Sequence, residues 1–195
     1  MSLFIPSLKK KIYFAALDKD PNSYRSEKRW SKRTFSLRSS SSCKDEDKII
    51  YISVDKELIY WNFFKDFGPL NLGHLYRFCE KFNSLCKDKP DHKLCLFSNK
   101  FKPELNVNAI CLLGCWLVLY QDKTPEEAIR PFISILSELP SFRDASSNEC
   151  TYNLTILDCL RGLVKAKIYN FFDFTKFNLA EYEYFEQVEV SIQFE

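Results

Sequence analysis

The chain has 195 residues, of which 46% are hydrophobic and 16% aromatic, and its formal net charge at pH 7 is +2. This composition predicts one globular domain with a sizeable core and excludes a disordered chain. The near balance of charge predicts no specific nucleic-acid partner and no membrane partner.

The first segment, residues 1–6, has too short an apolar run for a secretory signal peptide, so we expect a chain in the cytosol or nucleus. The eight cysteines are then expected to be reduced thiols. Since no Cys-x2-Cys pair is present and His74 and His92 do not fall at zinc-finger spacing, we predict no metal site and no cofactor. Cys111 and Cys115, four residues apart, are interpreted as core contacts.

Residues 11–17 and 49–54 are rich in aromatic and β-branched side chains, which predicts two strands. Residues 18–48 between them hold several lysines and arginines and a run of serines, so we expect a disordered or loosely held loop. A solvated loop is the favoured interpretation. The alternative is a regulatory segment, with a basic patch for nuclear import or an acidic partner and a kinase site at Ser36.

Residues 71–87 have the apolar spacing of an amphipathic helix, and Gly68 followed by Pro69 predicts the turn that leads into it. The triplet Asp66-Phe67-Gly68 matches a kinase motif, but no other kinase motif accompanies it, so we attribute it to chance. His74 lies in this helix without a recognisable nucleophile nearby, and we assign it no role.

Residues 93–97 predict a short buried strand, and residues 104–120 predict a central buried helix that is too short to cross a bilayer. A strand that leads through a loop into a buried helix is how the phosphate-binding element of a phosphatase is built. The loop here, residues 98–106, has no glycine, no arginine and no nucleophile, and Glu104 near the helix start would repel a phosphate.

Thr124 and Glu127 form a capping box that predicts a helix to about Leu139, and Thr151 is expected to cap the following helix. Helices on a short, largely buried set of strands indicate an α/β fold. The apolar residues expected to face inward in the first helix are Ala128, Ile129, Phe132, Ile133 and Leu136, and the stripe of the second is Leu154, Leu157, Leu160, Leu163 and Val164.

Three blocks of sequence, at residues 66–72, at 123–128, and at 142–146 running into 151–160, resemble the N-terminal domain of the cell-division-cycle-fourteen dual-specificity phosphatases. The resemblance covers nearly the whole chain apart from residues 18–48, which are an insertion relative to the family pattern, and the last six residues. It implies a dual-specificity-phosphatase-like layered sandwich. In this fold a short mixed sheet is flanked by helices around a buried central helix, and the phosphate loop is degenerate.

The resemblance also implies the domain organisation. Residues 1–177 form the phosphatase-like domain and residues 178–189 a linker-type helix. Residues 190–195 depart from the family; they alternate apolar and polar side chains like a short strand, and we interpret them as a divergent tail.

Catalysis in the resembling family is carried out by a second domain with a Cys-x5-Arg motif. None of the eight cysteines has an arginine six positions on, and the nearest match, Cys159 with Lys165, lies in a predicted helix without the bidentate geometry of arginine. We therefore predict no catalytic residue in this chain and no enzyme activity from the chain as it stands.

The leading functional hypothesis is a non-catalytic domain that recognises substrates of a dual-specificity phosphatase acting on cell-cycle phosphoproteins, for example in mitotic exit. The resemblance implies two partners: a catalytic phosphatase domain, in cis or in trans, and phosphoproteins with phosphoserine-proline and nearby basic residues. It also implies a nuclear and cytoplasmic location, with the centrosome or spindle as a cytoskeletal one.

The candidate site residues follow from this hypothesis. Glu181, Glu183 and Glu186 match an acidic segment that helps to line a groove for basic residues, and Phe142, Arg143 and Asp144 are expected at the interface with the catalytic domain. The alternative for the three glutamates is a solvated helix face, which stays open for Glu183 and is favoured for the other two.

Two further hypotheses remain. A free-standing pseudophosphatase that only binds partners would have a polar surface where the recognition domain should expose an apolar patch. An active enzyme with unorthodox residues is disfavoured, because a thiolate without arginine or converging amides has nothing to stabilise the developing charge.

Overall fold

The computed structural model describes residues 2–6, 11–21 and 49–192. The predicted loop at 18–48 therefore lies outside the described residues except for its first four. Residues 193–195 of the predicted tail also lie outside the described residues.

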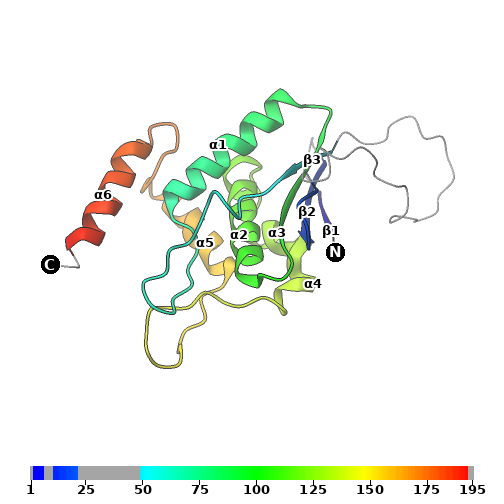
Figure 1. Ribbon diagram of the computed structural model, residues 1–195. Coiled ribbons are helices and arrows are strands. Elements are labelled where there is room, and N and C mark those ends of the chain that lie inside the picture. Colours follow the sequence, from blue (N-terminus) through cyan, green and yellow to red (C-terminus); the bar gives the residue numbers. More distant parts are fainter. Residues whose placement is uncertain (1, 7–10, 22–48, 193–195) are drawn as a thin grey trace, which may run out of the picture.

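The fold is α/β, as predicted, and is built on a mixed sheet of four strands in the order β1-β2-β4-β3 (Figure 1). The outer strand β1 runs antiparallel to β2, whereas β4 is parallel to both β2 and β3. The strand bounds are Ser2–Pro6 for β1, Lys11–Leu17 for β2, Ile49–Ile52 for β3 and Lys93–Asn99 for β4. The sequence reasoning missed β1.

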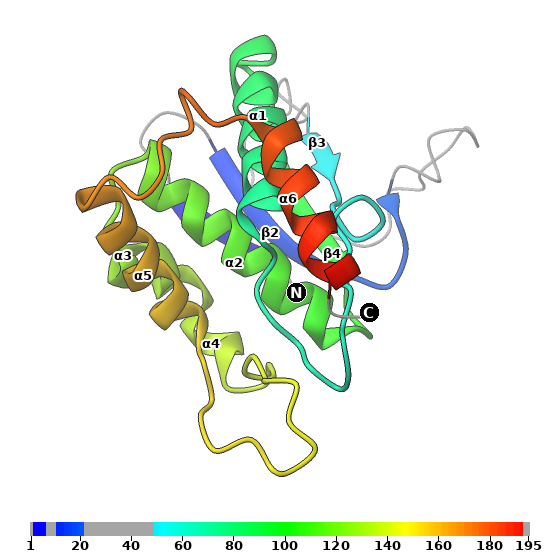
Figure 2. The same cartoon turned by 90° about the vertical axis from the view of Figure 1, so that its left-hand side faces the viewer.

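The helices are α1 (Leu72–Asp88), α2 (Pro103–Tyr120), α3 (Pro125–Ile129), α4 (Ile133–Leu136), α5 (Ile156–Ile168) and α6 (Leu179–Ile192). A 3-10 turn, Arg130–Phe132, joins α3 to α4. In Figure 1 these helices lie on one side of the sheet, and Figure 2 shows α6 crossing in front of the first half of α1. The large core cluster joins side chains of α1, α2, α3 and α5 to alternate residues of β2, β3 and β4.

The opposite face of the sheet carries a smaller cluster made of strand side chains, with Ala15, Cys95 and Phe97 at its centre. In the part of the chain that the structure describes, no helix packs on this face. The described helices therefore pack on one face of the mixed sheet, around the buried helix α2.

The helix α2 is the central buried helix that the apolar run predicts. Every residue from Asn106 to Val118 is buried. Cys111 and Cys115 are 5% and 7% exposed, which confirms that they are core contacts. The expectation that this helix is too short to cross a bilayer is wrong, since α2, among the described residues, has the length and apolar composition that a membrane span would need. Its burial on all sides nevertheless identifies it as the core helix of this domain.

The predicted helix from Thr124 to Leu139 is wrong in its second half. The capping box of Thr124 and Glu127 is present, but α3 ends at Ile129 and a 3-10 turn follows. The cause is Pro131, which lacks the N–H of an α-helical hydrogen bond and disfavours helical geometry in the residue before it. As a result Ile133 is 61% exposed instead of facing inward.

The predicted cap at Thr151 is also wrong. The cap of α5 is Thr155, whose side chain accepts a hydrogen bond from the amide of Asp158 in a capping box. Leu154 forms an isolated antiparallel bridge with Phe142, and the amide of Phe142 donates to its carbonyl at 2.9 Å. Because this bridge keeps the backbone extended as far as Leu154, the helix cannot begin earlier.

The strand-like reading of residues 190–195 is wrong for the three that are described, since α6 continues to Ile192. Periodicity over so few residues is a weak signal, and here the preceding helix continues into the segment as far as Ile192.

Candidate functional site

Aromatic rings hold α6 and the segment before it against α1. Tyr76 of α1 packs on Phe174 and Phe177, with ring centroids 5.3 and 5.1 Å apart, and Phe177 packs on Tyr182 of α6 at 5.3 Å. Opposite Tyr182 the first turn of α1 carries Gly73, where a Cβ atom would lie 3.1 Å from the ring. The glycine therefore permits the close approach of the two helices.

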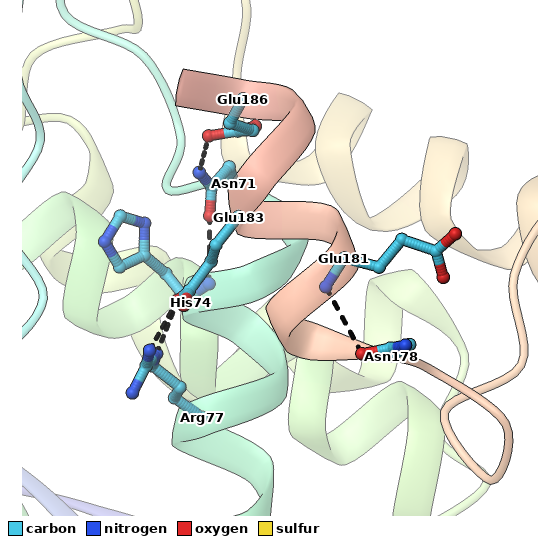
Figure 3. Close-up of polar contacts among 7 residues, drawn as sticks. All are labelled: Asn71, His74, Arg77, Asn178, Glu181, Glu183 and Glu186. Carbon is cyan, nitrogen blue, oxygen red and sulfur yellow. Dashed lines mark hydrogen bonds and ion pairs between the residues drawn. The ribbon is translucent and has the colours of Figure 1, made fainter. Parts of the chain in front are cut away.

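Polar contacts reinforce this packing and involve two of the predicted glutamates (Figure 3). Arg77 donates from Nε and Nη2 to Oε1 of Glu183, at 2.9 and 2.5 Å. Asn71 donates to Oε2 of Glu186, and the hydroxyl of Tyr182 donates to Oε1 of the same carboxylate at 2.7 Å. Both oxygens of Glu186 are thus used inside the domain, whereas the hydrogen bonds of Glu183 fall on Oε1.

The start of α1 places three polar residues on the face toward α6. Asn71 is the N-cap and its side-chain oxygen accepts from the amide of His74 at 2.9 Å. His74 and Arg77 follow three and six residues later, which brings all three to one side of the first two turns.

A cleft of about 820 Å³ opens beside this helix pair. Two segments build it in addition to α1 and α6: the loop after β3 and the turn that precedes α1. Its lining residues are Ile59, Tyr60, Trp61, Pro69, Asn71, His74, Glu183, Glu186 and Gln187. The walls therefore combine exposed aromatic and aliphatic side chains with two carboxylates.

Among the ionisable side chains that line the cleft, His74 is the one whose ordinary pKa lies nearest to pH 7. Its Nδ1 is buried without a hydrogen-bond partner among the described residues. Burial lowers the pKa of His74, the Arg77 guanidinium acts in the same direction, and the carboxylates of Glu186 and Glu183 oppose them. Burial and the hydrogen bond to Asp66 raise the pKa of Tyr60 to about 12, so its phenol is neutral.

The loop that joins β4 to α2 is closed by an internal carboxylate. Asp55, which follows β3, accepts from the hydroxyl of Ser98 at 2.9 Å and from the amide of Asn99 at 2.9 Å. Asn106 of α2 donates to the carbonyls of Asn99 and Lys102 at 2.9 and 3.0 Å. One amide of the loop, that of Asn99, is thus already bonded to the carboxylate of Asp55. A second carboxylate, Glu104, lies in the first turn of α2.

The other predicted site residues do not join this cleft. Glu181 does not line the cleft, and in Figure 3 it extends from α6 on the side away from Asn71 and His74. Its amide donates to Asn178 at the start of α6. Phe142 is 2% exposed and packs on Phe67 in the core of this domain, away from the cleft.

Arg143 and Asp144 organise their own loop instead. Arg143 donates to the carbonyls of Ser146 and Asn148 at 3.2 and 3.0 Å. Asp144 accepts from the hydroxyl of Ser146 at 2.7 Å. Neither lines the cleft.

Sequence reasoning missed Trp61, Asn71, His74 and Arg77 as neighbours of the glutamates. Trp61 is 84% exposed, and no sequence pattern marks it. The spacing of the three helix residues shows a shared face, but the sequence gives no signal that α6 packs on that face.

Comparison with known proteins identifies the domain. The family model described as the N-terminal half of dual specificity protein phosphatases matches residues 6–166. The human dual specificity protein phosphatase CDC14A is 48% identical over 147 residues, covering 71% of this chain and 24% of that protein. Mouse CDC14B is 42% identical over 141 residues, covering 71% of this chain and 29% of that protein.

The similarity extends to fungi. The tyrosine-protein phosphatase CDC14 of Saccharomyces cerevisiae is 33% identical over 147 residues, which cover 75% of this chain and 27% of the yeast protein. The aligned region is thus only about a quarter of the length of these relatives. The chain belongs to the dual-specificity protein phosphatase family, whose N-terminal half it matches.

Proposed function

We propose that this chain is a non-catalytic domain that recognises substrates for a dual-specificity protein phosphatase acting on cell-cycle phosphoproteins. The observation that carries the proposal is the closed loop: Asp55 accepts the hydrogen bonds of Ser98 and Asn99 in the element that would otherwise bind phosphate. A second anion beside this carboxylate would be repelled. Dephosphorylation is assigned to a separate domain with the Cys-x5-Arg motif.

The thiols support a non-catalytic role. Cys159, which comes nearest to the motif, lies in α5. Its hydrogen bond with Cys111 and, to a smaller extent, its burial raise the pKa of its thiol. Burial raises the pKa of Cys95 to about 12. Such thiols remain protonated at neutral pH, whereas the thiolate is the nucleophile of cysteine phosphatases.

The cleft supports recognition of a basic side chain. Glu183 is 40% exposed in its side chain, and both hydrogen bonds from Arg77 end on Oε1, so Oε2 is available to a ligand. The ion pair with Arg77 is half exposed and such pairs contribute little, so a lysine or arginine of a substrate can compete for this carboxylate. The proposed ligand is a basic residue near a phosphoserine-proline site.

The proposed partner is the catalytic domain, in cis or in trans. Tyr184 and Phe185 of α6 are 63% and 58% exposed and form an edge-to-face pair. Exposed aromatic side chains on this helix fit a surface that a second domain covers. They favour the recognition domain over a free-standing interaction module, which would be expected to have a polar surface here.

The test is hydrolysis of a phosphoserine-proline peptide with a following lysine, and of a generic aryl phosphate. The purified chain, a separately expressed catalytic domain and their mixture are compared. We expect no turnover by the chain alone, and faster hydrolysis of the peptide, but not of the aryl phosphate, in the mixture. Glu183→Gln should remove most of the gain, whereas Glu181→Gln, which changes a carboxylate directed away from the cleft, should keep it.

Three other results would change the conclusion. Turnover by the chain alone would overturn the non-catalytic role. An unchanged rate in the mixture would favour the free-standing module. If both glutamate variants lose the gain in peptide hydrolysis equally, the cleft is not the recognition site.

A further inference from the structure

His74 lines the cleft and, through its titration, can change the charge of the cleft between pH 5 and pH 7.5. We infer that His74 sets the pH range in which the cleft accepts a basic side chain: the neutral ring leaves the cleft acidic, and the protonated ring turns a cation away. This inference rests on the proposed function, because it concerns the same cleft and the same class of ligand.

The geometry favours a neutral ring. Since Nδ1 is enclosed and has no partner among the residues described, a proton on this atom would be a buried donor without an acceptor. The neutral form with its proton on Nε2 avoids that cost. The ring is therefore uncharged at pH 7.5. The two carboxylates beside it favour the protonated form, but they do not outweigh its burial.

The charged groups that face the ring come from both helices. Glu183 and Glu186 approach from α6 and Arg77 from α1, and the phenol of Tyr60 on the adjoining loop is uncharged. Two carboxylates and one guanidinium give the cleft a net negative charge. A proton on His74 cancels that charge and places a second cation beside the one that Arg77 already supplies.

The sign of the effect follows from linkage. Burial holds the pKa of His74 below 6.5, and a bound cation would lower it further. Binding of a basic ligand is therefore strongest above pH 6.5 and weakens as the pH falls below that value.

The experiment measures the affinity of the purified chain for a lysine-rich peptide at pH 7.5 and pH 5.5, by anisotropy of a rhodamine label that does not titrate in this range. The peptide carries no phosphate, since the second ionisation of phosphoserine lies near pH 6 and would obscure the result. A peptide with alanines in place of lysines controls for non-specific binding. For the wild-type chain we expect weaker binding at pH 5.5 than at pH 7.5, by less than about tenfold, because a histidine whose pKa lies below 6.5 cannot change the affinity by more than that between these two pH values.

The chain offers a matched control, since it has two histidines. His92 also has a buried Nδ1 without a partner among the described residues, but it does not line the cleft. We expect His74→Gln and His74→Met to bind equally well at both pH values, and His92→Gln to keep the wild-type pH dependence. Thermal melting at both pH values identifies any variant that fails to fold.

The outcomes separate the inference from the proposed function. If the His74 variants bind the peptide but retain the wild-type loss at pH 5.5, the inference is overturned and the cleft remains a basic-residue site. If the wild-type chain binds the lysine peptide no better than the alanine peptide at either pH, both are overturned.

Discussion

At the scale of single residues, Asp55 has the most informative environment in the domain. Its two oxygens accept from Ser98, which is fully buried, and from the backbone of Asn99. A fixed carboxylate therefore occupies one backbone amide of the loop between β4 and α2. This contact stabilises the loop, because the buried hydroxyl of Ser98 and the amide of Asn99 both find their acceptor in Asp55.

Asp55→Ala is expected to lower the free energy of unfolding by about 1–3 kcal/mol, because it leaves a buried hydroxyl and an amide without their acceptor. Urea unfolding monitored by tryptophan fluorescence measures the change. Asp91→Ala, at an exposed turn, is the control and should have little effect. A D55A chain as stable as the wild type would show that the loop does not depend on this carboxylate.

At the scale of the element, a long-range contact decides at which of two possible capping residues α5 begins. Thr151 and Thr155 are both acceptable caps by sequence, but the bridge between Phe142 and Leu154 keeps the chain extended beyond Thr151. The helix ends at Ile168, and Asn170 has a φ of 57°, a left-handed conformation that asparagine adopts more readily than most residues.

Thr155→Ala should lower the free energy of unfolding by about 1 kcal/mol, the usual contribution of an N-cap side chain. Thr151→Ala, an exposed threonine four residues earlier, should leave stability within about 0.5 kcal/mol of the wild type. Denaturant midpoints of the two variants are the comparison. A larger loss for T151A than for T155A would contradict the observed helix start.

At the scale of the whole molecule, α6 is attached through a few rings and polar contacts rather than through the main core. Its aromatic contacts join the half-buried rings of Tyr76, Phe174, Phe177 and Tyr182. Its polar contacts end on Glu183 and Glu186. Few buried contacts imply that α6 can open without unfolding of the domain. The cleft, which has one wall on α6, depends on this attachment.

Phe177→Ala should release α6 while the core stays folded, because Phe177 joins Tyr76 to Tyr182. Hydrogen–deuterium exchange is expected to be faster in α6 and unchanged in α2. Phe171→Ala is the matched control: this ring is 81% exposed and should leave exchange in α6 as in the wild type. Equal protection of α6 in F177A and wild type would rule out the aromatic attachment.

The sequence by itself determined those features that depend on residues close to one another along the chain. The strand, loop and buried helix at residues 93–120, the amphipathic helix α1 and the capping box of α3 all follow from periodicity and from residues at most four apart. The absence of Cys-x5-Arg and the match to the family blocks are likewise properties of spacing, and the family assignment is confirmed.

Only the tertiary structure decided the composition of the site. Asp55 and Ser98 are 43 residues apart, and Asn71 and Glu186 are 115 apart, so no local pattern could pair them. The acidic segment was recognisable, but which of its glutamates enters the cleft depends on which side of α6 faces α1. That orientation is set by the packing of aromatic rings against Gly73 and Tyr76, and it brings His74, which the sequence leaves without a role, beside Glu183 and Glu186.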